Sequence, residues 1–158
     1  MLKPLIIGLL CSLPAIAFAQ IPKFSDYPAK VYNGPAAKLV LDSQDAKDFR
    51  TRLRDALKEK PNFAGEYVIT MWGCGAGCRS YSIINKRTGR LLKDGFGGEG
   101  GGDVTDAKAN SRLIITEGPQ YEGEYSDRKV GYNRDYYVLN GQKLQLIKRV
   151  PIKEPNEE

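Results

Sequence analysis

Two cysteines separated by three residues, Cys74 and Cys78, stand between two segments that have the pattern of β-strands. Residues 66–72 alternate between two faces, as half-buried strands do, and residues 81–84 form a second strand candidate. An extended chain places the two cysteines about 13 Å apart, whereas a disulfide needs Cα atoms within roughly 7 Å of each other. The two glycines inside the loop allow the positive φ angles of a sharp reversal. In an oxidising compartment, the pattern therefore predicts a hairpin closed by a disulfide.

Residues 1–19 have the three parts of a secretory signal peptide. Lys3 supplies a positive charge, residues 5–13 form an apolar stretch too short to span a bilayer, and residues 17–19 match a small-x-small cleavage site. An uncleaved membrane anchor is the alternative, which the length and the flanking residues disfavour. We expect a mature chain that begins at Gln20, has no membrane insertion and is periplasmic or secreted.

The composition restricts the chemistry of this chain. It contains no His, which excludes Ser-His and Cys-His catalysis and zinc sites with His ligands. Loss of Lys3 lowers the net charge from +5 to +4. Basic and acidic residues are interspersed, so we expect no nucleic-acid partner, which would need a clustered basic patch. The two cysteines left after cleavage are too few for a structural zinc site. We expect no metal and no cofactor, and the oligomeric state stays open.

Helical periodicity over residues 43–60 predicts one amphipathic helix, which Pro61 ends. Phe49 and Leu53 lie on its apolar face and are expected to pack against a sheet. Alternation and turn signals then predict further strands. The strand candidates are residues 37–41, 66–72, 81–84, 90–93, 112–116, 135–139 and 143–150.

Two similar strand patterns, over residues 66–93 and 112–150, suggest two meanders. The sequence therefore predicts a single α+β domain over residues 20–152, followed by a disordered tail over residues 153–158. The domain would hold an antiparallel sheet of about six strands, covered by the N-terminal amphipathic helix. A small β-barrel or a propeller-like fragment is the alternative.

Four side chains are candidates for binding. Trp72 and Arg79 flank the disulfide loop, and both residue types are common in binding hot spots. The competing interpretation of Trp72 is a core residue that packs against the disulfide. Tyr121 and Tyr125 lie in a polar stretch, where tyrosines form a recognition surface or anchor a loop to a sheet.

The glycine-rich residues 95–102 are followed by Asp103. They lack the Gly-Lys-Ser/Thr sequence of a phosphate-binding loop. Three nearby carboxylates, Glu99, Asp103 and Asp106, match no EF-hand spacing, so whether this segment binds an ion stays open. Its composition predicts a flexible surface loop.

The motif Asn62-Phe63-Ala64-Gly65, followed by Trp72-Gly73-Cys74-Gly75-Ala76-Gly77-Cys78, resembles a family of uncharacterised exported proteins of Gram-negative bacteria. The likeness covers roughly residues 61–80. Members often carry His where this chain has Glu66, so a role for that His does not transfer. The resemblance implies export, and it implies no activity.

These features favour a non-catalytic binding or inhibitory module, immunity-like, that uses the disulfide-pinned loop. Its partner would be another envelope protein or a cell-wall polymer. An envelope enzyme is the alternative, either a thiol-disulfide redox protein at Cys74 and Cys78 or a carboxylate hydrolase. The redox alternative is weakened because the spacing differs by one residue from Cys-x-x-Cys and no helix is predicted to follow the first cysteine. A structural envelope component is a third interpretation.

Overall fold

A computed structural model of the protein describes residues 20–98, 101–123 and 126–155. The predicted signal peptide, residues 1–19, lies outside these residues. Tyr125, Glu99 and the last three residues of the predicted tail also lie outside them. In the described part of that tail, the Glu154 carboxylate pairs with the ammonium group of Lys129, a residue outside the tail.

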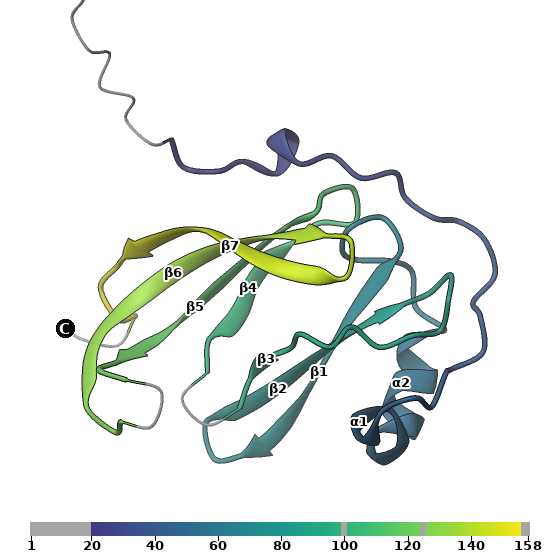
Figure 1. Ribbon diagram of the computed structural model, residues 1–158, viewed down its shortest axis with the longest axis horizontal. Helices are drawn as coiled ribbons and strands as arrows, with labels where there is room; N and C mark the ends of the chain where they lie inside the picture. The colour runs from purple at the N-terminus through teal and green to yellow at the C-terminus, as the bar shows by residue number, and fades with distance from the viewer. Residues whose placement is uncertain (1–19, 99–100, 124–125, 156–158) are drawn as a thin grey trace, which may run out of the picture.

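Within the described residues, the chain is mostly antiparallel β-structure with few helices (Figure 1). Seven strands form two open sheets, one in the order β1-β2-β3 and the other in the order β4-β5-β6-β7. The strands are β1 (Tyr67–Gly75), β2 (Cys78–Asn85), β3 (Phe96–Gly97), β4 (Asp103–Ala107), β5 (Leu113–Tyr121), β6 (Lys129–Asn140) and β7 (Lys143–Pro151). The helices are the 3-10 turn η1 (Phe24–Asp26), α1 (Gln44–Asp48) and α2 (Arg50–Ala56).

The prediction of one six-stranded sheet is wrong, because the first meander breaks off early. Residues 90–93 form no strand, and Leu91 makes an isolated bridge to Ile84. Leu91 packs against the helices and Leu92 packs between the sheets, and two backbone hydrogen bonds, at Arg90 and Leu92, join this segment to β2. Residues 37–41 also form no strand and make single hydrogen bonds to the turn after β2.

The predicted helix over residues 43–60 is also wrong in its extent. It is divided at Phe49, whose φ of −99° and ψ of 17° depart from helical values. The Phe49 ring lies 4.6 Å from the Trp72 ring, centroid to centroid, so tertiary packing overrides the periodic pattern at this residue. Ser43 caps α1 by accepting from the Ala46 N–H. Leu53 is fully buried, as predicted.

Three apolar clusters form the core of the molecule. One lies between the helices and β1–β2, the second lies between the two sheets, and the third lies on the outer face of the second sheet. Alternate residues of β5 supply the last two, since Leu113 and Ile115 face outward and Ile114 faces inward. The largest fully buried side chains include Phe63, Leu53, Ile83, Ile84, Leu113 and Ile114.

The segment before α1 runs along the upper side of the molecule in Figure 1 and then descends to α1, and its Phe24 and Tyr27 side chains pack against the third cluster. Ser111 fixes its start by donating to the Phe24 and Tyr27 carbonyl oxygens at 2.8 and 3.0 Å. Gly65 holds its middle, because a Cβ there would collide with the Lys30 carbonyl oxygen and its φ is +81°. The Asn-Phe-Ala-Gly motif thus serves the packing of this segment. No helix among the described residues is long and apolar enough to cross a membrane.

Candidate functional site

The predicted disulfide between Cys74 and Cys78 is present, and the two Cα atoms are 5.1 Å apart. It closes the loop between β1 and β2, where the pairing register shifts between Gly73 and Gly75. Gly75 and Gly77 have φ angles of +146° and +70°, which side-chain-bearing residues rarely adopt. The bond thus fixes an exposed loop at the end of the hairpin.

The structure places Trp72 and Arg79 on opposite faces of this hairpin. Trp72 pairs with Ser80, whereas Arg79 pairs with Gly73, and neighbouring residues of a strand point to opposite sides. Trp72 is 8% exposed and packs against Phe49 on the helix side. This position favours its interpretation as a core residue, while Arg79 remains on the face of the second sheet.

The first sheet meets β4 and β5 along a seam of close backbone contacts. Gly97, at the end of β3, approaches Gly101, which lies just before β4, because a Cβ on Gly101 would collide with the Gly97 carbonyl oxygen. A Cβ on Gly118 would lie 2.5 Å from the Gly102 Cα atom. The described part of the glycine-rich segment is therefore packed at this seam, where absent side chains permit the approach. Phe96–Gly97 form strand β3, so these two residues are not part of the surface loop that was predicted.

A polar cavity of about 470 Å³ opens at the seam, and we call it the seam cavity. The β1–β2 loop and the adjoining ends of β5 and β6 lie at the same end of the molecule, at the lower edge of Figure 1. The cavity brings together the predicted residues Arg79 and Tyr121. Its lining is Ala76, Gly77, Cys78, Arg79, Gly98, Gly101, Asp103, Glu117, Gly118, Pro119, Tyr121 and Tyr132.

Two carboxylates face each other across the cavity wall, because Asp103 on β4 pairs directly with Glu117 on β5. Each accepts from its own arginine. Arg79 Nη1 lies 2.7 Å from Asp103 Oδ2, and Arg134 Nη2 lies 2.6 Å from Glu117 Oε1. The Tyr81 hydroxyl donates to the second Asp103 oxygen at 3.2 Å. Asp103 is thus held in place by Arg79 and Tyr81, and Glu117 is held in place by Arg134.

Two tyrosines near the cavity, Tyr132 and Tyr81, have raised pKa values. Burial raises the pKa of Tyr132, and the negative charges of Glu117 and Asp103 raise it further. Burial also raises the pKa of Tyr81, with Asp103 as the next cause. A hydrogen bond to Glu117 raises the pKa of Arg134. At neutral pH the phenols are therefore protonated and can donate hydrogen bonds.

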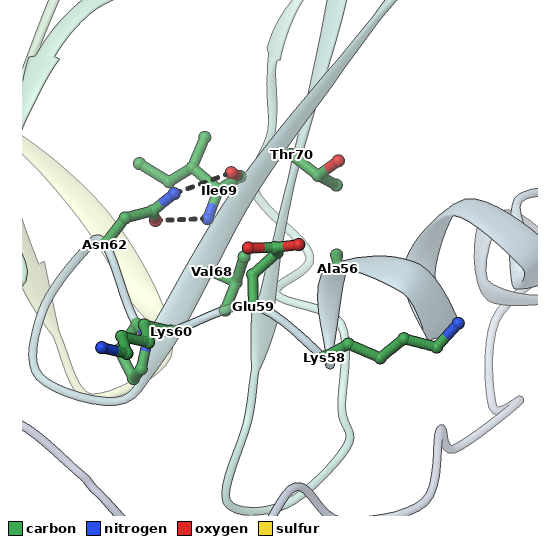
Figure 2. A pocket seen from close by; sticks show the side chains of 9 residues that line it. Ala56, Lys58, Glu59, Lys60, Asn62, Val68, Ile69 and Thr70 are labelled. Atoms are coloured by element: carbon green, nitrogen blue, oxygen red, sulfur yellow. Dashed lines mark hydrogen bonds between the residues drawn. The ribbon is translucent and has the colours of Figure 1, made fainter.

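A second hollow, of about 580 Å³, lies beside the outer edge of β1 (Figure 2). Asn62 occupies this edge as a neighbouring strand would. Its carboxamide accepts from the Ile69 N–H at 2.7 Å and donates to the Ile69 carbonyl oxygen at 3.0 Å. In Figure 2 the Glu59 carboxylate points into the hollow, while Lys58 extends away from it. This arrangement protects an exposed sheet edge. The disulfide and the candidate tyrosines do not line this hollow.

Sequence reasoning missed Glu117 and Arg134 as site residues. The strand predicted for residues 112–116 ended just before Glu117, whereas β5 continues to Tyr121. The available signal was alternation, because Leu113, Ile115, Glu117 and Tyr121 share a period of two residues. Among the described residues, no group of three or more Cys, Asp or Glu side chains is arranged to hold a metal ion.

Tyr125 lies outside the described residues, so its place relative to the seam cavity is not assigned. Comparison of the chain with protein-family models, with curated proteins and with solved structures finds no match. The geometry of the seam cavity is therefore the basis for assigning a function.

Proposed function

We propose that this protein is an exported, non-catalytic binding or inhibitory module whose recognition site is the seam cavity. One observation carries the proposal: three segments far apart in the sequence converge on one polar cavity. The disulfide loop contributes Arg79, the glycine-rich segment contributes Asp103, and the β5–β6 pair contributes Tyr121 and Tyr132. Its partner is another envelope protein or a cell-wall polymer.

Rigidity supports a role in binding. The disulfide closes the loop from Cys74 to Cys78, and the ion pair between the adjacent Arg79 and Asp103 holds the end of that loop against the second sheet. A preformed site binds more tightly, because less conformational entropy is lost when the partner arrives. The signal-peptide pattern of residues 1–19 and the disulfide together favour the periplasm or the cell exterior as the place of action.

The same geometry favours binding over glycoside hydrolysis. Hydrolases of that class need one protonated carboxyl group beside one ionised carboxylate. Here Asp103 and Glu117 each accept from an arginine, an arrangement that favours two fixed acceptors. Such acceptors orient a ligand.

Site-specific photo-crosslinking in the producing cells tests the proposal. A photoreactive phenylalanine analogue replaces Tyr121 in the cavity, or Ile147, an exposed residue of β7 that does not line it. We expect a defined crosslinked product from position 121 and none from position 147. Equal crosslinking from both positions, or none from position 121, would refute the seam cavity as the recognition site.

A further inference from the structure

The proposed function leaves the chemistry of the ligand open, and the charges and hydrogen-bonding groups of the cavity narrow it. Resting on that proposed function, we infer that the seam cavity binds an uncharged glycan chain. Three observations point to this class of ligand: the balance of charge at the cavity, the unused hydrogen-bonding groups on its wall, and the two tyrosine rings on one face of β5–β6.

The charges at the cavity balance one another. Arg79 pairs with Asp103 at 2.7 Å, and Arg134 pairs with Glu117 at 2.6 Å. Lys129, whose ammonium group lies 5.8 Å from the Tyr132 ring centroid, pairs with Glu154. An ionic ligand would have to compete with these internal partners and lose its hydration without gaining an unpaired counter-charge. A neutral polar ligand meets no such cost.

Unused hydrogen-bonding groups remain on the cavity wall. Among the described residues, Glu117 Oε2 accepts no hydrogen bond, because both contacts from Arg134 go to Oε1. The hydroxyl groups of Tyr121 and Tyr132 likewise have no hydrogen-bond partner there. The wall thus offers one carboxylate acceptor beside two groups that both donate and accept. A polyhydroxylated chain supplies both donors and acceptors to such a wall.

The two tyrosines also supply flat apolar surface. Tyr132 pairs across the strands with Pro119, and Tyr121 pairs with Lys129, so both rings stand on one face of β5–β6. Tyrosine combines a flat ring with a polar tip, which suits the apolar faces and hydroxylated edges of sugar rings. A protein anchor would instead need a largely apolar pocket. The volume of about 470 Å³ lies within the usual range of ligand sites, roughly 300–1,000 Å³.

A charge-matched set of tetrasaccharides tests the inference. The purified protein, labelled with ¹⁵N, is titrated with two neutral probes, the N-acetylglucosamine tetramer and maltotetraose. Two charged probes, the cationic glucosamine tetramer and an anionic galacturonic acid tetramer, are titrated in parallel. We expect at least one neutral probe to give saturable amide shifts at Ala76–Arg79, Tyr121 and Tyr132, with both charged probes weaker by about tenfold or more.

Variants locate the binding and separate the outcomes. Tyr132→Ala and Glu117→Gln should each weaken the neutral probe by about tenfold, whereas Ile147→Ala should leave the affinity unchanged. Saturable shifts that survive both cavity variants would overturn the inference, and so would tighter binding of either charged probe. If neither neutral probe binds while position 121 still crosslinks to a protein, the glycan inference is wrong and the proposed binding function stands.

Discussion

Replacing Gly118 with alanine should destabilise the protein by crowding the seam that forms the cavity. The new Cβ would lie 2.5 Å from the Gly102 Cα atom and 3.1 Å from the Gly102 nitrogen. Both are backbone atoms, so no side-chain rotation relieves the clash. Overpacking of this kind costs about 1–3 kcal/mol. The φ of Gly118 is not in the left-handed region, so the cost comes from the close approach rather than from backbone strain.

Gly131→Ala is the matched control in the neighbouring strand β6. A Cβ there meets nothing within 4 Å, and its φ is not in the left-handed region. We expect its free energy of unfolding to be unchanged or to rise by about 0.4–1 kcal/mol, because alanine restricts the unfolded chain. Urea denaturation followed by circular dichroism compares the two variants. Equal stabilities would show that the backbones of Gly102 and Gly118 do not approach as described.

Three further measurements test the fold and the site. Asn62→Ala removes both hydrogen bonds to Ile69 and should lower the free energy of unfolding by about 1–3 kcal/mol; a urea midpoint equal to that of the wild type would contradict the role of Asn62 at the β1 edge. Leu53→Ala should cost about 2–5 kcal/mol, because the side chain is fully buried, and a calorimetric midpoint equal to that of the wild type would place Leu53 outside the core. Because the pKa of Tyr132 is raised, its stabilising contribution is complete below about pH 10 and is lost as the pH rises through the raised value. Compared with the wild type, the alkaline ultraviolet titration of Tyr132→Phe should lack one phenol ionisation above pH 10. Loss of an ionisation at or below pH 10 would refute the raised pKa.

Local sequence signals predicted the parts of the fold that depend on local structure. Strict alternation located β1, and the Asn140-Gly141 dipeptide located the turn between β6 and β7. The division of the helix at Phe49 could not be read in this way, because it depends on a contact with Trp72, distant in the sequence. Strand β4 was missed because few apolar residues mark it after the glycine-rich segment.

Some residues of the candidate site were predictable from the sequence, but their assembly was not. Cys74, Cys78, Arg79 and Tyr121 were identified from residue type and spacing. Their convergence depends on the seam between the sheets, where glycines permit an approach that no periodic pattern reveals. Glu117 was missed because a polar residue near the end of a strand reads as the beginning of a loop.

The disulfide-free protein gives the most direct test of the proposal that a pinned loop forms one wall of the recognition site. Replacing Cys74 and Cys78 together with serine frees the loop, which is short, so the expected loss of stability is about 2 kcal/mol. The variant should remain folded, with a cooperative denaturation transition. It should nevertheless lose the crosslink from position 121, because Arg79 no longer holds its place beside Asp103. A folded variant that crosslinks as the wild type does would contradict the account.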